Sequence, residues 1–278
     1  MAEQKTQVVA IESGQLQGVY QEAERIAVFK GIPFAAPPVG ELRWKPPQPV
    51  TPWEGVRQAT KFSPMAYQRA AEFEKFVGNL IGGQGWNFLR REGLKMLLKV
   101  APKPKMSEDC LYLNVRTPSL DSNAQLPVMV WIHGGDHQDG SGSEIFYDSN
   151  EIAKQGVVVV SINYRLGVMG YFTHPELSAE SPLGVSGNYG TLDQFAALEW
   201  VQNNIDAFGG DPDNVTIFGE SAGGESVAHM LTSPLAQGLF HKAILQSPAN
   251  AGQMYHLRES FLTRMPAEEV GLGFAEKA

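Results

Sequence analysis

One short stretch of this sequence has the residue types of a nucleophilic catalyst. It reads Gly219-Glu220-Ser221-Ala222-Gly223, a G-x-S-x-G pattern. A serine hydroxyl is a weak nucleophile at neutral pH, so it must project to a place where a base can reach it. A sharp turn between a strand and a helix does this, and the flanking glycines let the two elements approach closely. The pattern therefore indicates Ser221 as a catalytic nucleophile, with Gly219, Glu220 and Gly223 in supporting positions.

The flanking residues distinguish an active-site turn from a chance glycine–serine loop. Residues 214–218 have the β-branched and aromatic character of a strand, and residues 224–231 are compatible with a helix. This strand–turn–helix order is the context in which the pattern forms a nucleophile elbow. Ser221 would then lie at the amino end of a helix, where unpaired N–H groups stabilise developing negative charge.

A second glycine stretch offers the other half of such a site. Residues 128–132 are continuously apolar, as in a strand buried on both faces, and they lead into His133-Gly134-Gly135. Backbone N–H groups after such a strand, with the N–H of Ala222, form the oxyanion hole of an α/β-hydrolase. The alternative is that these glycines only end the strand in a turn.

The bulk composition limits the classes of function. With 278 residues, 43% of them hydrophobic and 19% charged, the chain can bury a sizeable core. The net charge of −8 argues against nucleic acid as the main partner. The longest β-rich apolar run, residues 157–160, is too short to span a membrane. Cys110 is the single cysteine, so no disulfide can form within the chain, and we expect a reducing, cytoplasmic location.

Alternation of strands and helices predicts the fold class. Short alternating segments in residues 8–34 predict antiparallel strands joined by tight turns. Further strands are expected at residues 109–115, 128–132, 157–163, 214–218 and 242–246, and helices near residues 149–155 and 192–204. This order predicts an α/β fold with a mostly parallel central sheet and antiparallel strands at the amino end.

Residues 69–100 differ in character from the rest of the chain. Apolar residues recur there at helical spacing on both sides of Gly82-Gly83, so two helices are expected. They could form a flap over a substrate pocket, or a packed helical hairpin that touches no substrate.

The motifs and their order resemble those of the type B carboxylesterase and cholinesterase family of α/β-hydrolases. The matching stretches are Gly31 to Ala35, Pro37 to Gly40, Glu108 to Val115, Trp131 to Gly135, Asn163 to Gly167, Asn188 to Gln194, Phe208 to Pro212 and Gly219 to Gly224. The resemblance implies hydrolysis of small-molecule carboxylic esters through an acyl-serine on Ser221, with no cofactor and no metal. It also implies an oxyanion hole built from the N–H groups of Gly135, Asp136 and Ala222, with Gly134 in support.

Asp136 departs from the family pattern, which usually has a third glycine there. An aspartate keeps the backbone N–H, but its negative charge should repel a developing oxyanion, so we expect weakened esterase turnover. In the alternative, Asp136 acts as a local base for water that attacks an acyl- or phosphoryl-serine. That role would favour dephosphorylation of organophosphates.

Two further departures concern Cys110 and the end of the chain. Secreted relatives pair the cysteine of this motif with one upstream, where Ala66 stands here, so Cys110 is expected to be a buried structural thiol. In α/β-hydrolases the acid and the histidine of the triad follow the serine. Only His229, His241 and His256 follow Ser221 here, and no later strand end is available to carry an acid and a base.

We therefore interpret residues 1–278 as one α/β-hydrolase domain that is incomplete at its carboxyl end, with residues 69–100 as a helical insert near the pocket. The triad acid and histidine are expected outside this chain, in the missing carboxy-terminal half of the same enzyme. The chain alone is expected to be inactive or very weak. The rival interpretation is a non-catalytic, cholinesterase-like binding protein, because the family includes members without hydrolytic activity.

Three other polar residues have structural interpretations, and a fourth suggests a metal site. His133 is expected to hydrogen-bond its own loop, and Glu220 and Asp193 are expected to be buried, hydrogen-bonded carboxylates. His137 beside Asp136 suggests a metal-binding pair, but no third ligand at regular spacing supports one.

Overall fold

The structure is a computed structural model that describes residues 4–68, 92–93, 96, 105–248 and 255–277. The helical pair expected in residues 69–100 lies outside the described residues except for three positions. Among the described residues, no helix is both long enough and apolar enough to cross a membrane.

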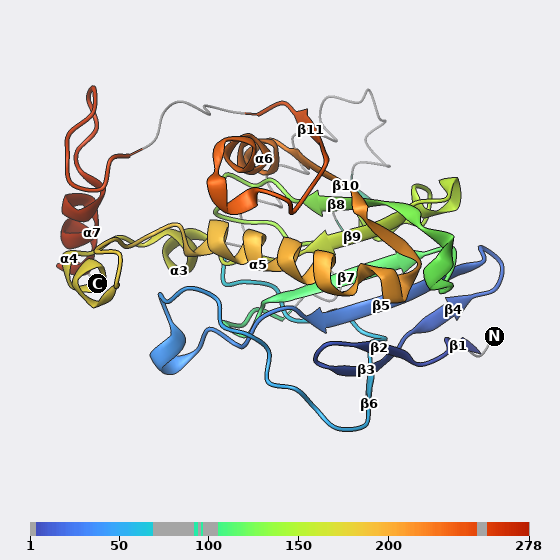
Figure 1. The fold of residues 1–278 in the computed structure, drawn as a ribbon. Coiled ribbons are helices and arrows are strands. Elements are labelled where there is room, and N and C mark those ends of the chain that lie inside the picture. The colour runs from blue at the N-terminus through green and yellow to red at the C-terminus, as the bar shows by residue number, and fades with distance from the viewer. Residues whose placement is uncertain (1–3, 69–91, 94–95, 97–104, 249–254, 278) are drawn as a thin grey trace.

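A large mixed sheet forms the centre of the molecule (Figure 1). Its strands lie in the order β1 (Gln4–Lys5), β4 (Val19–Gln21), β5 (Ile26–Pro33), β7 (Tyr112–Thr117), β9 (Val158–Ile162), β8 (Leu126–Ile132), β10 (Gly210–Glu220) and β11 (Lys242–Gln246). Pairing is antiparallel from β1 to β9 and parallel from β9 to β11. A smaller sheet combines β2 (Val9–Ile11), β3 (Gly14–Gln17) and β6 (Val56–Gln58).

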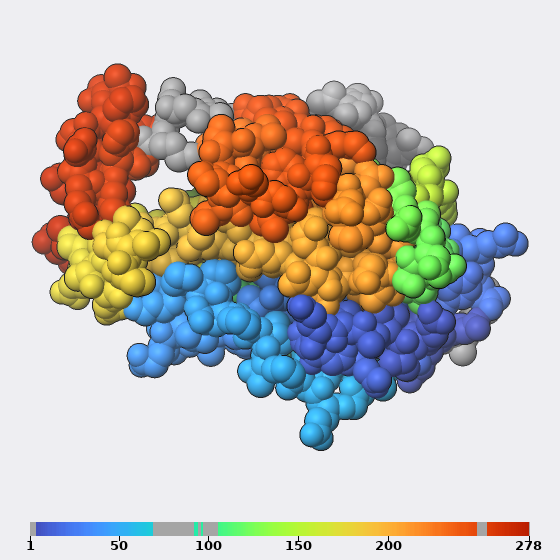
Figure 2. Space-filling model, in the orientation of Figure 1, coloured from blue at the N-terminus to red at the C-terminus, as the bar shows by residue number. Residues whose placement is uncertain are grey.

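The helices follow the strands of the parallel half. They are α3 (Gly167–Tyr171), α4 (Pro175–Glu180), α5 (Tyr189–Asn204), α6 (Ala222–Thr232) and α7 (Ala267–Ala275). Single 3₁₀ turns lie at Gly40–Leu42, Ser122–Ala124, Ala153–Gln155, Ile205–Phe208 and Pro234–Ala236. Helix α6 packs on β8, β10 and β11, while α7 lies beside α4 at one end of the molecule (Figures 1 and 2).

The core lies where the parallel strands meet the helices. Its fully buried side chains include Val128, Val130 and Ile132 of β8, Val158, Val160 and Ile162 of β9, and Val215 and Ile217 of β10. Each such side chain contributes about 1.5–3 kcal/mol to folding by leaving water. This apolar centre fixes the carboxyl ends of β8 and β10, from which the glycine stretches project.

The predicted strands are confirmed with shifted ends, and one predicted helix is wrong. The helix expected near residues 149–155 is only a 3₁₀ turn, because the buried Asn150 side chain instead accepts a hydrogen bond from Arg116 Nε at 3.0 Å and Gly156 ends the turn in a left-handed conformation. The stretch that begins at Gly31 is the end of β5, and Ile32 and Phe34 are buried there.

A buried ion pair connects α5 to the segment before α3. The Asp193 carboxylate accepts hydrogen bonds from the backbone N–H and Nε of Arg165 at 3.0 and 2.8 Å through one oxygen. The other oxygen accepts from a terminal guanidinium nitrogen at 2.7 Å. Both side chains are almost completely buried, which confirms the expectation for Asp193. Neither charge has access to water, so each depends on the other.

Replacing Asp193 with asparagine should lower the free energy of unfolding by about 3–5 kcal/mol, because an uncompensated buried guanidinium remains. Urea unfolding measures this change. The matched control is Asp213→Asn at an exposed position, which should stay within about 0.5 kcal/mol of the parent. Equal urea midpoints for Asp193→Asn and Asp213→Asn would contradict the conclusion that the buried charges of Asp193 and Arg165 depend on each other.

Candidate active site

Ser221 lies at a strained turn between β10 and α6. Its backbone has φ 56° and ψ −123°, which costs a non-glycine residue about 1–3 kcal/mol. Two hydrogen bonds hold this conformation: the Ser221 N–H donates to the Gln246 carbonyl at 2.9 Å, and the Glu225 N–H donates to the Ser221 carbonyl at 2.9 Å. The Ser221 side chain remains partly exposed, as a nucleophile requires.

Glycines allow the backbone crossing at this turn. A Cβ on Gly219 would lie 2.4 Å from the carbonyl carbon of Gly223. A Cβ on Gly223 would lie 2.1 Å from the carbonyl oxygen of Ile132, in β8. Only glycine permits both approaches, which confirms the close packing expected from the sequence.

The second glycine stretch lies directly against this turn. A Cβ on Gly134 would lie 2.6 Å from the carbonyl oxygen of Glu220 and 3.2 Å from the Ser221 Cβ. In the described part of the chain, the N–H groups of Gly135, Asp136 and Ala222 donate no hydrogen bond. The structure thus places beside the serine the loop that the sequence predicts as its oxyanion partner.

The loop after Gly135 folds tightly back on itself. Asp136 and His137 both have φ 54°, in the left-handed region. The N–H groups of Gln138 and Asp139 donate to the Gly135 carbonyl at 2.8 and 3.0 Å. The Asp136 side chain is exposed, so its carboxylate is in water rather than packed inside the loop.

His133 has the structural role expected from the sequence. It is 1% exposed, and its Nδ1 lies 2.8 Å from the Gly134 carbonyl oxygen. The Tyr164 hydroxyl donates to the His133 carbonyl at 2.8 Å, and the two rings stack at 4.3 Å. Burial lowers the pKa of His133 to about 4, so the ring is neutral at physiological pH.

His137 makes a polar contact with helix α6 that was not predicted from the sequence. Its Nε2 lies 2.9 Å from the Ser226 hydroxyl of α6, and the Gly167 N–H donates to its carbonyl at 2.7 Å. Burial, with a smaller contribution from His229, lowers the pKa of His137 to about 4. The sequence contained one signal for this contact. Ser226 follows Ser221 by five residues, on the buried side of helix α6, where a polar side chain needs a hydrogen-bond partner.

The histidines after Ser221 are not arranged as its base. His229 lies two helical turns along α6, about 12 Å from Ser221 at 1.5 Å per residue. His241 accepts a hydrogen bond from the Val215 N–H at 3.2 Å, at the middle of β10 and six residues before Ser221. His256 precedes α7, where its ring stacks on Phe261.

Glu220 is exposed, so the expectation of a buried carboxylate is wrong. It lies at the carboxyl end of β10, which pairs on that side with β11, the last strand of the sheet. Four of the five β11 residues are exposed, including Ile244 and Leu245. Among the described residues, no group of three histidine, cysteine, aspartate or glutamate side chains could hold a metal ion.

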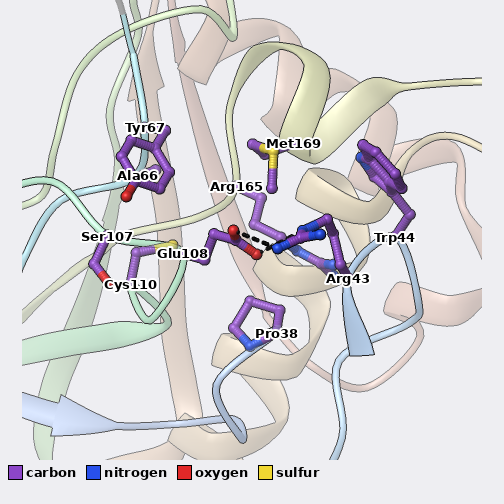
Figure 3. A pocket seen from close by; sticks show the side chains of 10 residues that line it. All are labelled: Pro38, Arg43, Trp44, Ala66, Tyr67, Ser107, Glu108, Cys110, Arg165 and Met169. Carbon is purple, nitrogen blue, oxygen red and sulfur yellow. Dashed lines mark hydrogen bonds and ion pairs between the residues drawn. The ribbon is translucent and has the colours of Figure 1, made fainter. Parts of the chain in front are cut away.

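Cys110 is buried, as expected, and burial raises the pKa of its thiol. It lines a small cavity together with Ala66 (Figure 3). At the mouth of this cavity, Arg43 donates two hydrogen bonds to Glu108 at 2.8 and 2.7 Å.

Comparison with known proteins decides the family. The profile of the carboxylesterase family matches residues 5–277. The chain belongs to this carboxylesterase family. It is 47% identical over 251 residues to a fumonisin B1 esterase of Sphingopyxis macrogoltabida and 45% identical over 245 residues to a para-nitrobenzyl esterase of Bacillus subtilis. These matches cover 90% and 88% of this chain but 41% and 44% of the two relatives.

Solved structures agree on the α/β-hydrolase fold. A para-nitrobenzyl esterase superposes with a TM-score of 0.75 at 41% identity, over 97% of this carboxylesterase-family chain and 48% of its own. The carboxylesterase EST55 of Geobacillus stearothermophilus superposes with a TM-score of 0.69 at 43% identity, over 86% and 43% of the two chains. This family member therefore spans less than half the length of the relatives it matches.

The close approach of the two backbones at Gly223 can be tested by comparing alanine substitutions at two glycines that lie in helices. Gly223→Ala should destabilise the protein by at least about 1–3 kcal/mol, because its Cβ meets a strand carbonyl. Gly273→Ala in α7 meets nothing within 4 Å and should stabilise it by about 0.5–1 kcal/mol. Urea unfolding compares the two, and changes of equal sign would contradict the packing.

The two depressed histidine pKa values predict acid sensitivity. Between pH 6.5 and about 4, the unfolded chain binds protons that the folded His133 and His137 do not. The free energy of unfolding should therefore fall as pH falls through this window, on the order of 1 kcal/mol or more per histidine. Unfolding curves at several pH values should show a shallower fall in His137→Phe than in the parent. An unchanged slope would contradict the burial of this ring.

Proposed function

We propose that this chain supplies the nucleophile and the oxyanion hole of a carboxylic ester hydrolase. The observation that carries the proposal is the contact between the Ser221 turn and the loop at Gly134. A Cβ added to Gly134 would lie 3.2 Å from the Ser221 Cβ. The Ser221 hydroxyl gives its proton to the base and attacks the ester carbonyl. The ester C–O bond then breaks, the alcohol leaves with that proton, and an acyl-serine remains. Water hydrolyses the acyl-serine to the carboxylic acid and frees Ser221. The N–H groups of Gly135, Asp136 and Ala222 stabilise the oxyanion of each tetrahedral intermediate.

The proposal places the base and its acid partner outside residues 1–278. In support, the described histidines that follow Ser221 all have other neighbours. The chain also spans 41% and 44% of two relatives that are named as esterases. The exposed β11 strand, with Ile244 44% and Leu245 37% exposed, offers a sheet edge with apolar side chains on both faces for further polypeptide of the same enzyme.

The substrate class follows from the site and the relatives. An oxyanion hole of three N–H groups stabilises the tetrahedral intermediate of acyl transfer. Relatives carry the names para-nitrobenzyl esterase, carboxylesterase and fumonisin B1 esterase. We therefore assign a small-molecule carboxylic ester as the substrate, without a choice of acyl or alcohol group.

Labelling of the serine tests the enzyme against the binding protein. In the full-length gene product, a fluorophosphonate should modify Ser221 stoichiometrically, as mapped by peptide mass spectrometry. Ser221→Ala should lose both this label and hydrolysis of p-nitrophenyl acetate, because it lacks the nucleophile. Ser233→Ala, at a surface serine that caps a 3₁₀ turn, should keep both. A folded parent with unmodified Ser221 would contradict the hydrolase and favour the binding protein.

Asp136 should limit the turnover of ordinary esters. The Asp136→Gly variant removes a negative charge beside the oxyanion and relieves a left-handed φ of 54°. We expect kcat/KM for p-nitrophenyl acetate to rise by about tenfold, or about 1.4 kcal/mol of transition-state stabilisation. The control Asp206→Asn, which changes an exposed aspartate outside the site, should leave kcat/KM unchanged. A glycine variant no faster than the parent would contradict this role for the charge.

The same variant separates the alternative role of Asp136. If its carboxylate activates water against a phosphoryl-serine, the parent enzyme should recover from organophosphate inhibition faster than Asp136→Gly. Equal recovery of the two proteins would exclude that role.

A further inference from the structure

A hydrogen-bonded bridge joins the loop at Asp136 to helix α6. The His137 Nε2 lies 2.9 Å from the Ser226 hydroxyl oxygen. The side-chain amide of Gln194, in α5, donates to the same oxygen at 3.1 Å. Ser226 and Gln194 are almost completely buried, so neither exchanges these contacts for water without a cost.

The Ser226 hydroxyl can complete this bridge in either direction. Its oxygen accepts from Gln194 and has a second lone pair, so it can accept from a protonated His137 Nε2 or donate its own hydrogen to an unprotonated one. Both tautomers of the neutral ring therefore keep the contact between the loop and α6.

The surroundings of the ring keep it neutral. The rings of Tyr164 and Tyr171 lie at 6.1 and 5.1 Å, and desolvation is the main influence that lowers the pKa of His137 to about 4. His229 in α6 also lowers this pKa, while the Asp136 carboxylate raises it. Near neutral pH, His137 therefore makes its contact with Ser226 as a neutral ring.

The backbone at this point needs such an anchor. Asp136 and His137 both have φ 54°, a conformation that non-glycine residues rarely adopt. Two contacts hold His137 there: the Gly167 N–H donates to its carbonyl, and Ser226 bonds to its ring. Without the ring contact, the peptide of Asp136 would depend on main-chain hydrogen bonds alone, namely this one and the two that the Gly135 carbonyl accepts.

We propose that His137 is a positioning residue of the oxyanion hole, which holds the Asp136 N–H toward the Ser221 site through its bridge to Ser226. The proposal rests on the proposed esterase function and assigns a new role within that site. It makes the chemical step, rather than substrate binding, sensitive to the bridge, because the donor acts on charge that develops in the transition state.

The test measures how fast a fluorophosphonate modifies Ser221 in the full-length gene product. His137→Phe keeps an aromatic ring between Tyr164 and Tyr171 but removes both nitrogens, and Ser226→Ala removes only the hydroxyl. Each should lower the maximal rate of phosphonylation about tenfold or more, with the half-saturating concentration little changed. The double variant should be no slower than the slower single variant, because both break one bridge. His137→Gln, which keeps a polar group at Nε2, should recover part of the rate.

The possible results separate the two claims. If the parent labels normally and His137→Phe and Ser226→Ala label at the same maximal rate, the positioning role is wrong and the proposed function stands. A folded parent that does not label overturns the proposed function and the positioning role together. Nitrogen-15 NMR of His137 gives a readout independent of labelling: a ring-nitrogen shift that changes in Ser226→Ala supports the bridge, and an unchanged shift contradicts it.

Discussion

The close approach of two backbones at the carboxyl ends of β8 and β10 is the constraint on which the rest of this structure depends. A Cβ on Gly223 would lie 2.1 Å from the Ile132 carbonyl, and one on Gly134 would lie 2.6 Å from the Glu220 carbonyl. Side chains at either point would separate the loop from the serine. The parallel pairing of β8 with β10 brings both ends to one edge of the sheet, where ligands of α/β folds are bound.

A second set of contacts keeps that crossing in place. Asp193 in α5 holds Arg165, two residues before Gly167, and the Gly167 N–H holds the His137 carbonyl. The chain of contacts therefore runs from a buried ion pair to the loop that faces Ser221. The free energy of desolvating both charges offsets the attraction between them, so the contribution of this pair is geometric. It fixes the segment before α3 against α5 and, through Gly167, against the loop at His137.

Much of the fold and the centre of the site could be predicted from local pattern. Continuous apolar runs indicated the buried strands, and the glycines around Ser221 indicated the turn. Each of these signals is contained in a few consecutive residues, so local pattern is enough to detect it. Glu220 could not be placed in this way. It lies at the carboxyl end of β10 beside β11, the last strand of the sheet, and strand order depends on pairings between residues far apart in the sequence.

The role of His137 was hidden for a related reason. Its contacts Ser226 and Gly167 lie 89 and 30 residues away in the sequence, and only the fold brings them together. The helix expected near Ser149 failed because the side chain of Asn150 bonds to Arg116 on a neighbouring strand, a contact that propensity does not register. Tertiary contacts, rather than weak local signals, account for these differences.

The central claim is that Ser221 and the 135–136 loop form one reaction site. A crystal structure of the full-length gene product after reaction with an alkyl fluorophosphonate tests it most directly. The account predicts a phosphonyl group on the Ser221 hydroxyl, with its non-bridging oxygen about 3 Å from the backbone nitrogens of Gly135, Asp136 and Ala222. A phosphonyl oxygen that points into solvent, away from these three nitrogens, would contradict it.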